Sequence, residues 1–140
     1  MSVYLPIIGG AVLKFYVSPT NIWTANYFVG IAADAPNPVN TQVIPWIAPG
    51  PGTVSDLAVQ GLARQTTGGT LHLTMLKAAG SITPSYSATA LSAEILNQAG
   101  NGHDAENSFD VELGDMVLVT LDGNWSGGQS VSARWKPRVS

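Results

Sequence analysis

The sequence predicts an all-β protein built as a sandwich or barrel of antiparallel strands. Eight or nine short segments alternate apolar and polar residues, which is the two-residue period of a half-buried strand. Clusters of glycine, proline, serine and asparagine separate these segments every eight to twelve residues, a spacing typical of sandwiches and barrels. No internal repeat and no coiled-coil heptad accompanies them.

Length and composition agree with a single folded domain. The chain has 140 residues, enough to bury roughly two thirds of the surface that an unfolded chain exposes. It has no cysteine, so disulfides and thiolate metal sites are excluded and nothing implies an oxidising compartment. Stability is therefore expected from packing or from assembly.

The low charge of the sequence suggests a protein that covers part of its surface with neighbours. Only 11% of the residues are charged, against roughly 25% in an average soluble domain. Charged residues are depleted at the centres of protein interfaces. The alternative is an ordinary serine- and threonine-rich β domain with a neutral surface. The net charge of -3 gives no reason to expect nucleic acid or an anionic membrane as a partner.

The N-terminal third is less regular than the rest and rich in proline. Residues 1–10 are apolar but lack a basic start, and Pro6 interrupts them, so we expect neither a signal peptide nor a membrane span. Six of the nine prolines lie between Pro19 and Pro51. We expect an arm over residues 1–10 and one domain over residues 11–140. The elements expected in this third are strands over 11–17 and 23–33, a turn over 18–21, an irregular connection over 34–40 and an extended edge segment over 42–47.

The stretch from Pro49 to Val59 introduces the regular part of the chain. Two Pro-Gly pairs favour a tight turn, and a strand begins directly after them. Residues 70–78 alternate even more clearly, and we expect the two strands to pair as antiparallel neighbours. In the first of them, simple alternation places Val54, Asp56 and Ala58 on one face and Ser55, Leu57 and Val59 on the other.

The remaining elements follow the same pattern of short strands and polar turns. Residues 86–96 are ambiguous: a strand is the prediction, and a helix over 90–99 ending at a glycine is the alternative. In the turn at Gly114-Asp115 we expect the Asp115 side chain to accept backbone hydrogen bonds. The other predicted elements are turns over 79–85 and 122–128, polar loops over 63–69 and 97–107, strands over 108–113, 116–121 and 129–135, and a basic tail over 136–140.

The last two thirds of the chain contain a particular order of segments: Pro49-Gly50, Thr53–Val59, Leu71–Lys77, Thr89–Ser92 and Gly114–Val119. This order resembles the jelly-roll modules of bacteriophage virions, which include capsid cement (decoration) proteins and tail-fibre head domains. It is also similar to modules related to tumour necrosis factor. The resemblance implies an antiparallel jelly-roll β-sandwich of about eight strands. A fibre head normally follows a repetitive shaft, which is not seen here, so the resemblance favours a cement protein and implies a homotrimer bound between capsomers.

Few residues suggest catalysis or ligand chemistry. No Gly-x-Ser-x-Gly elbow is present, and two histidines offer few candidate bases. For His72, inside a strand, we expect a histidine whose hydrogen bonds are satisfied within the sheet or at an interface. His103, Asp104 and Glu106 form a local cluster, but zinc needs three or four converging ligands and calcium needs six or more oxygens. We therefore predict no catalytic residue, no metal site and no cofactor, in a protein that is not an enzyme.

The predicted function is structural. We expect a homotrimer that binds the major capsid protein on the outside of a phage capsid, so that it belongs to the virion after assembly in the bacterial host cytoplasm. Two groups of residues are candidates for these contacts. The alternative for the apolar group in the arm is an ordinary first strand, and the alternative for the basic group near the C-terminal end is a solvated tail. The residues expected to contact capsid or neighbouring subunits are an apolar group in the arm and a basic group near the C-terminal end: Val3, Tyr4, Leu5, Ile7, Ile8, Arg134, Lys136 and Arg138.

A second function stays open at this point, a receptor-binding (carbohydrate-binding) module of a phage tail or head fibre. Such a module would use exposed tryptophan, asparagine and aspartate side chains in the loops over 97–107 or 122–128. Tryptophan can stack on a sugar or anchor an interface, because it offers a large face and one donor. Four tryptophans are available, and at least two of them are expected in the core: Trp23, Trp46, Trp125 and Trp135.

Overall fold

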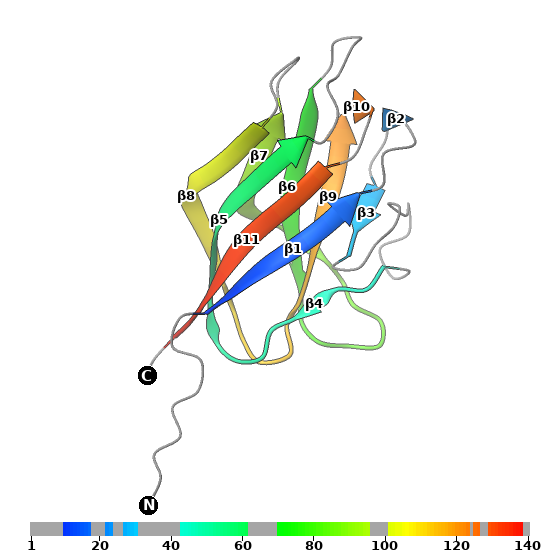
Figure 1. Ribbon diagram of the computed structural model, residues 1–140. Helices are drawn as coiled ribbons and strands as arrows, with labels where there is room; N and C mark the ends of the chain where they lie inside the picture. Colours follow the sequence, from blue (N-terminus) through cyan, green and yellow to red (C-terminus); the bar gives the residue numbers. More distant parts are fainter. Residues whose placement is uncertain are drawn as a thin grey trace, which may run out of the picture.

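All regular structure in the described part of the chain is β-strand (Figure 1). The computed structural model describes residues 10–17, 22–23, 27–30, 43–61, 70–95, 101–123, 125–126 and 129–138. Across these ranges there is no helix of the length and hydropathy that a bilayer span requires. The strands are β1 (Ala11–Val17), β2 (Ile22–Trp23), β3 (Tyr27–Val29), β4 (Trp46–Ile47), β5 (Gly52–Gly61), β6 (Leu71–Ala78), β7 (Ser87–Ile95), β8 (Asn101–Val111), β9 (Met116–Gly123), β10 (Trp125–Ser126) and β11 (Gln129–Pro137).

The strands form two antiparallel sheets that pack face to face. Sheet I has the order β1-β11-β5-β8, and sheet II has the order β3-β9-β6-β7, with β4 also paired to β9. The short strands β2 and β10 pair with each other. Sheet I lies in front of sheet II in Figure 1. Consecutive strands often lie in different sheets, so the chain crosses the sandwich repeatedly.

This strand order is that of a jelly roll. Eight of the described strands are longer than two residues, in agreement with the predicted sandwich of about eight strands. The predicted strand over 86–96 is confirmed as β7, and the helix alternative is not adopted there. The extended segment around Pro45 contributes only β4, a two-residue strand beside β9, because proline lacks the donor that a longer ladder needs.

The hydrophobic core lies between the two sheets. Leu71, Leu73 and Met75 of β6 are fully buried, as their alternation predicted, and sheet I contributes Phe15 and Val131. Burial of apolar surface on this scale is the main stabilising contribution to such a fold. The core therefore explains why a chain without disulfides can form a sandwich.

Strands β5 and β6 do not pair, contrary to the sequence prediction. β5 lies between β11 and β8 in sheet I, whereas β6 lies between β9 and β7 in sheet II. Both strands have one apolar face, and placing them in opposite sheets lets both faces contribute to the same core. Their connection includes the loop predicted over 63–69, which lies outside the described residues.

A bulge at Asp56 reverses the alternation of β5 and corrects the predicted faces. Asp56 has a φ of 55°, in the left-handed region, which aspartate tolerates better than most residues. The register with β11 and with β8 shifts at this point. As a result Val54 and Leu57 are both buried, although simple alternation had placed them on opposite faces.

The predicted polar loop over 97–107 is wrong, because strand β8 already begins at Asn101. The strand approaches β7 very closely at Gly102. A Cβ atom built on Gly102 would lie 1.9 Å from the carbonyl oxygen of Glu94, so only glycine fits there. The polar side chains of this strand face solvent or accept hydrogen bonds within a bulge. For this reason the strand has the amino-acid composition of a loop.

Two further boundaries differ from the predictions. The turn expected over 122–128 is shorter, because β9 extends to Gly123 and β10 occupies Trp125–Ser126. The last strand, β11, extends to Pro137, so residues 136 and 137 of the expected tail belong to this strand. The turn predicted over 18–21 and the irregular connection predicted over 34–40 lie outside the described residues.

Candidate interaction surface

The basic residues near the C-terminal end do not share one environment. Arg134 and Lys136 alternate with buried residues of β11 and are exposed on the outer face of sheet I. The Arg134 Nε lies 4.0 Å from Asp56 Oδ2, with both side chains more than half exposed. An ion pair at this distance and exposure contributes little to stability. Arg134 and Lys136 are therefore available for contacts with another molecule.

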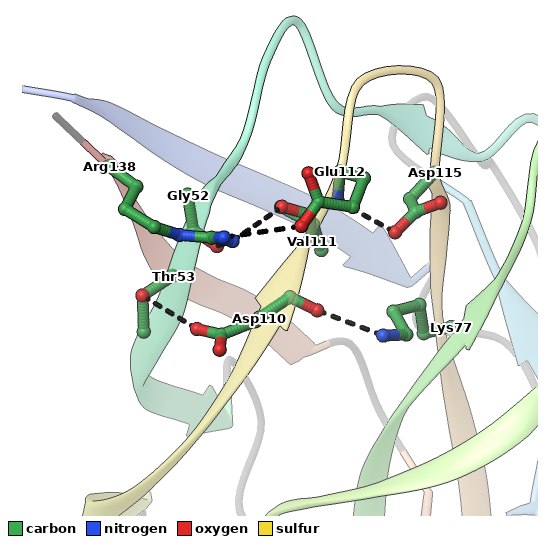
Figure 2. A network of polar contacts seen from close by, with 8 residues as sticks. All are labelled: Gly52, Thr53, Lys77, Asp110, Val111, Glu112, Asp115 and Arg138. Carbon is green, nitrogen blue, oxygen red and sulfur yellow. Dashed lines mark hydrogen bonds and ion pairs between the residues drawn. The ribbon is translucent and has the colours of Figure 1, made fainter. Parts of the chain in front are cut away.

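Arg138, in contrast, is anchored to its own chain (Figure 2). Its Nη1 donates to Glu112 Oε1 over 3.2 Å, and its Nη2 donates to the Val111 carbonyl oxygen, also over 3.2 Å. Its backbone N–H donates to the carbonyl oxygen of Pro51 over 2.9 Å. These bonds connect the end of β11 to β8 and to the start of β5, so Arg138 is less available to a partner than its two basic neighbours.

The same end of the sandwich carries a link between the two sheets. Lys77 of β6 donates from Nζ to the Asp110 carbonyl oxygen of β8 over 2.9 Å, as Figure 2 shows. Thr53 donates to the Asp110 carboxylate over 2.9 Å. Sheets I and II are thus connected here by a polar contact in addition to the core.

Three large apolar side chains are exposed on adjoining connections at this end. The exposed fractions are 50% for Ile47, 73% for Leu113 and 99% for Ile82. They belong to β4, to the turn between β8 and β9, and to the connection between β6 and β7. We refer to these three residues as the apolar loop end. Exposed apolar side chains that form one patch are typical of interaction sites, whereas isolated ones need no explanation, so the placement of the three connections matters.

Backbone contacts hold these connections next to one another. Ala48 donates to the Asp115 carbonyl oxygen over 2.8 Å, and Gly114 donates to the Ala48 carbonyl oxygen over 2.9 Å. The Asp115 carboxylate accepts from the Glu112 N–H over 2.8 Å, which confirms the predicted turn. Gly80 lies so close to the Gly114 carbonyl oxygen that an added Cβ would be 2.6 Å from it. The connections that carry Ile47 and Leu113 are therefore hydrogen-bonded to each other, and the connection that carries Ile82 packs against them at Gly80.

Asp104 ties the edge strands of the two sheets together. It is only 9% exposed, and its carboxylate accepts from the Ser92 N–H of β7 over 3.1 Å. It also accepts from the N–H groups of Glu106 and Asn107, both over 3.1 Å, and from the Asn107 side-chain amide. Burial alone would raise the pKa of Asp104, but these hydrogen bonds outweigh it and lower the pKa below its ordinary value.

The geometry around Asp104 bears on the local cluster of His103, Asp104 and Glu106, for which no metal site was predicted. Three residues of β8, 105–107, lie opposite the single residue Asp56 of β5, so the strand bulges outward after Asp104. The donors of this bulge occupy the carboxylate oxygens that a cation would need. Within the described ranges, no group of three histidine or acidic side chains converges.

The other histidine, His72, lies on the exposed face of sheet II, where its Nδ1 is 3.2 Å from Oε1 of Glu94.

Two tryptophans bridge the sheets. The rings of Trp46 in β4 and Trp135 in β11 are 6.0 Å apart and tilted by 58°. Trp135 is 5% exposed and belongs to the core, and Trp46 is partly buried against it. Trp135 agrees with the expected core tryptophans, and a second one stays a prediction. The Trp135 indole N–H has no hydrogen-bond partner among the described residues. Gly52 packs beside it, since an added Cβ would lie 2.3 Å from Nε1.

A polar hollow lies on the outer face of sheet I, and sequence reasoning did not find it. Strand register places Ser132, Ala58 and His103 side by side across β11, β5 and β8. The next row consists of Ser130, Gln60 and Asn101. Together with backbone of β5 and β8, these six residues line a volume of about 360 Å³. The sequence could not predict this hollow, because its residues are far apart in the chain and are brought together only by the strand order and register.

The arm residues predicted to contact a partner are not among the described residues. Their placement therefore adds nothing to the candidate surface, and they stay a prediction. The group comprises Val3, Tyr4, Leu5, Ile7 and Ile8.

Comparison with known proteins does not assign a family. No family model matches the sequence, and no curated protein matches it. Among solved structures, the crystal structure of murine APRIL aligns over 87% of this chain and 98% of its own, with 9% sequence identity and a TM-score of 0.39. A superposition this loose supports no inference about function or assembly. The fold assignment rests on the strand order.

Proposed function

We propose that this chain is a structural virion protein that binds the outside of a phage capsid as a homotrimer and stabilises the shell between capsomers. The observation that carries the proposal is the apolar loop end, where Ile47, Ile82 and Leu113 are exposed on connections that lie next to one another. The phage setting is supported by the resemblance of the segment order to cement proteins. The partner in this proposal is the major capsid protein.

A fixed display of apolar side chains suits a binding role. Association pays for the ordering of loops and side chains at the interface, and connections that are already fixed reduce that cost. The backbone bonds between Ala48, Gly114 and Asp115 supply this order in the free protein. Burial of the three side chains against a partner would then be favourable by roughly 25 cal/mol per Å² of apolar area removed from water.

Stabilisation of the shell would follow from many weak contacts. In a trimer, one bound copy raises the effective concentration of the other two at their own sites, so modest contacts add to a strong attachment. A protein that binds the assembled shell and not its separated subunits shifts the equilibrium toward the shell by mass action. This mechanism needs no catalytic residue and no cofactor.

The first experiment is the molar mass of the purified chain by light scattering after size exclusion, alone and with capsids that lack it. The proposal expects a trimer that co-migrates with the capsids. A monomer that does not associate with them contradicts it.

Variants of the apolar loop end test the carrying observation directly. The double substitution Ile82→Ser and Leu113→Ser should weaken capsid co-sedimentation at least tenfold and leave the midpoint of urea unfolding unchanged, because both side chains are exposed. The matched control is Val12→Ser, which removes an equally apolar side chain, 64% exposed, from β1. Equal binding by the double variant and the control would exclude the apolar loop end as the contact.

The arm and the exposed basic residues are separate candidate contacts within the same proposal. Deletion of residues 2–10 with no loss of capsid binding would remove the arm from it. Arg134→Ala and Lys136→Ala should weaken binding more at low salt than at high salt, because exposed charges are screened by salt. Binding by these variants that is unchanged at every salt concentration would exclude the two side chains.

A further inference from the structure

We infer that the polar hollow on the outer face of sheet I is a binding site for a neutral saccharide. This site lies on strands β5, β8 and β11 and is distinct from the apolar loop end. The inference goes beyond the proposed function and does not depend on capsid binding.

The hollow exists because small side chains lie between longer ones. Ala58 is at the centre of its row, between Ser132 on β11 and His103 on β8. Neighbouring strands are about 4.8 Å apart, so the two rows of three residues form a floor about two strand spacings wide. Gln60, Asn101 and His103 are exposed, and they have the longest side chains around this floor.

The chemistry of the lining favours an uncharged ligand with many hydroxyl groups. Gln60 and Asn101 carry amides, which donate and accept hydrogen bonds. Ser130 and Ser132 carry hydroxyls, which also do both, and His103 adds a ring nitrogen of each kind when neutral. Among the described residues that line the hollow there is no lysine, arginine, aspartate or glutamate. Such a lining matches the alternating donors and acceptors of a sugar better than it matches a phosphate or a carboxylate.

The charges of the same sheet face support this choice. Arg134 and Lys136 lie further along β11, beyond the hollow, and Asp56 lies near Arg134. An anionic ligand would find its cations outside the hollow, at Arg134 and Lys136 and at Lys14 of β1, which is paired with Ser132 but does not line the hollow. The volume of about 360 Å³ is at the lower end of the range of roughly 300–1,000 Å³ for small-molecule sites. It therefore suits one or two sugar rings.

The experiment is a titration of the full-length, ¹⁵N-labelled chain with neutral mono- and disaccharides, followed by two-dimensional NMR. The probes are glucose, galactose, mannose, N-acetylglucosamine and their β-linked disaccharides. At least one of them should shift the amide signals of residues 58–60, 101–103 and 130–132 in a saturable manner. Signals of the apolar loop end should stay unchanged.

Three variants make the assignment specific. His103→Ala and Asn101→Ala should each weaken sugar binding at least fivefold, because each variant loses a hydrogen bond worth about 1 kcal/mol. Ser132→Phe should abolish binding by filling the hollow, and its fold is checked by circular dichroism. The matched control is His72→Ala, which removes the exposed histidine of sheet II and should bind like the parent.

Each other outcome overturns the inference. No saturable shift with any of the sugars excludes a saccharide site. Shifts that persist in all three variants place the sugar elsewhere. If His103→Ala changes the molar mass of the protein in solution, the face is an interface between copies of this chain and not a ligand site.

Discussion

At the residue scale, Asp104 contributes the most concentrated set of polar contacts in the described structure. Its carboxylate accepts from backbone donors on both β7 and β8, so it connects strands of different sheets. An asparagine in its place keeps one acceptor oxygen and turns an NH₂ group toward donors. We expect Asp104→Asn to lower the free energy of unfolding by about 1–3 kcal/mol, the cost of a buried donor left without an acceptor, measured by urea unfolding.

The lowered pKa of Asp104 adds a test in acid. A carboxyl whose folded pKa lies below its unfolded value of about 3.9 stabilises the fold above that value. This contribution is lost as the pH falls through the folded pKa. The parent should therefore lose stability over this acid range more steeply than Asp104→Asn. The control is Glu106→Gln, an exposed acid two residues away; a control as unstable as Asp104→Asn would show that general charge, and not the hydrogen bonds, is responsible.

A second prediction at this scale concerns the left-handed backbone of Asp56. Asp56→Gly and Asp56→Ala both remove the carboxylate that accepts from Ser55 and lies near Arg134. Only glycine adopts a φ of 55° without strain. The alanine variant should therefore be less stable than the glycine variant by about 1 kcal/mol, as measured by thermal or urea unfolding. Equal stability of the two variants would mean that the bulge can relax to an ordinary strand.

At the element scale, the close approach of β8 to β7 predicts a strong effect of a single methyl group. Gly102→Ala places a Cβ against the Glu94 carbonyl oxygen and must push the two edge strands apart. We expect a loss of about 1–3 kcal/mol in the free energy of unfolding, with faster amide exchange in β7 and β8. Gly50→Ala is the matched control, because nothing lies within 4 Å of its added Cβ. A Gly102→Ala variant as stable as this control would contradict the close packing.

The same elements show what alternation can and cannot predict. β6 was predicted as a strand from its alternation, and Leu71, Leu73 and Met75 are buried; a register shift with β7 between Thr74 and Leu76 buries Leu76 as well. The first part of β8, residues 101–107, was missed because residues 105–107 bulge outward and Asp104 turns inward to accept their donors. A polar strand with such a bulge has the composition of a loop. The faces of β5 were missed for a related reason, since one left-handed residue shifts every later side chain.

The candidate surfaces were only partly predictable. Arg134 and Lys136 were named from their local spacing, and the structure exposes both. Arg138 was named with them, but its guanidinium binds Glu112 and the Val111 carbonyl oxygen, which are distant in sequence. Neither the apolar loop end nor the polar hollow could be found from the sequence, because strand order brings their residues together.

At the scale of the whole molecule, the two sheets are joined on several sides as well as through the core. Asp104 and Ser92 connect β8 to β7. Lys77 connects β6 to β8. The rings of Trp46 and Trp135 meet between β4 and β11. Because of these contacts, neither sheet can separate from the other without breaking contacts elsewhere in the molecule. We therefore expect the sandwich to unfold as one cooperative unit.

The measurement is equilibrium unfolding followed by two spectroscopic probes. It uses the double variant Trp23→Phe and Trp125→Phe, which keeps only Trp46 and Trp135 as tryptophans. Fluorescence then reports the Trp46–Trp135 contact between the sheets, and far-ultraviolet circular dichroism reports the strands themselves. The two transitions should share one midpoint. If the chain is a trimer, that midpoint rises with protein concentration, but the probes should still coincide. A fluorescence change that precedes the loss of strand signal would show that the sheets part before they unfold, and would contradict a single cooperative sandwich.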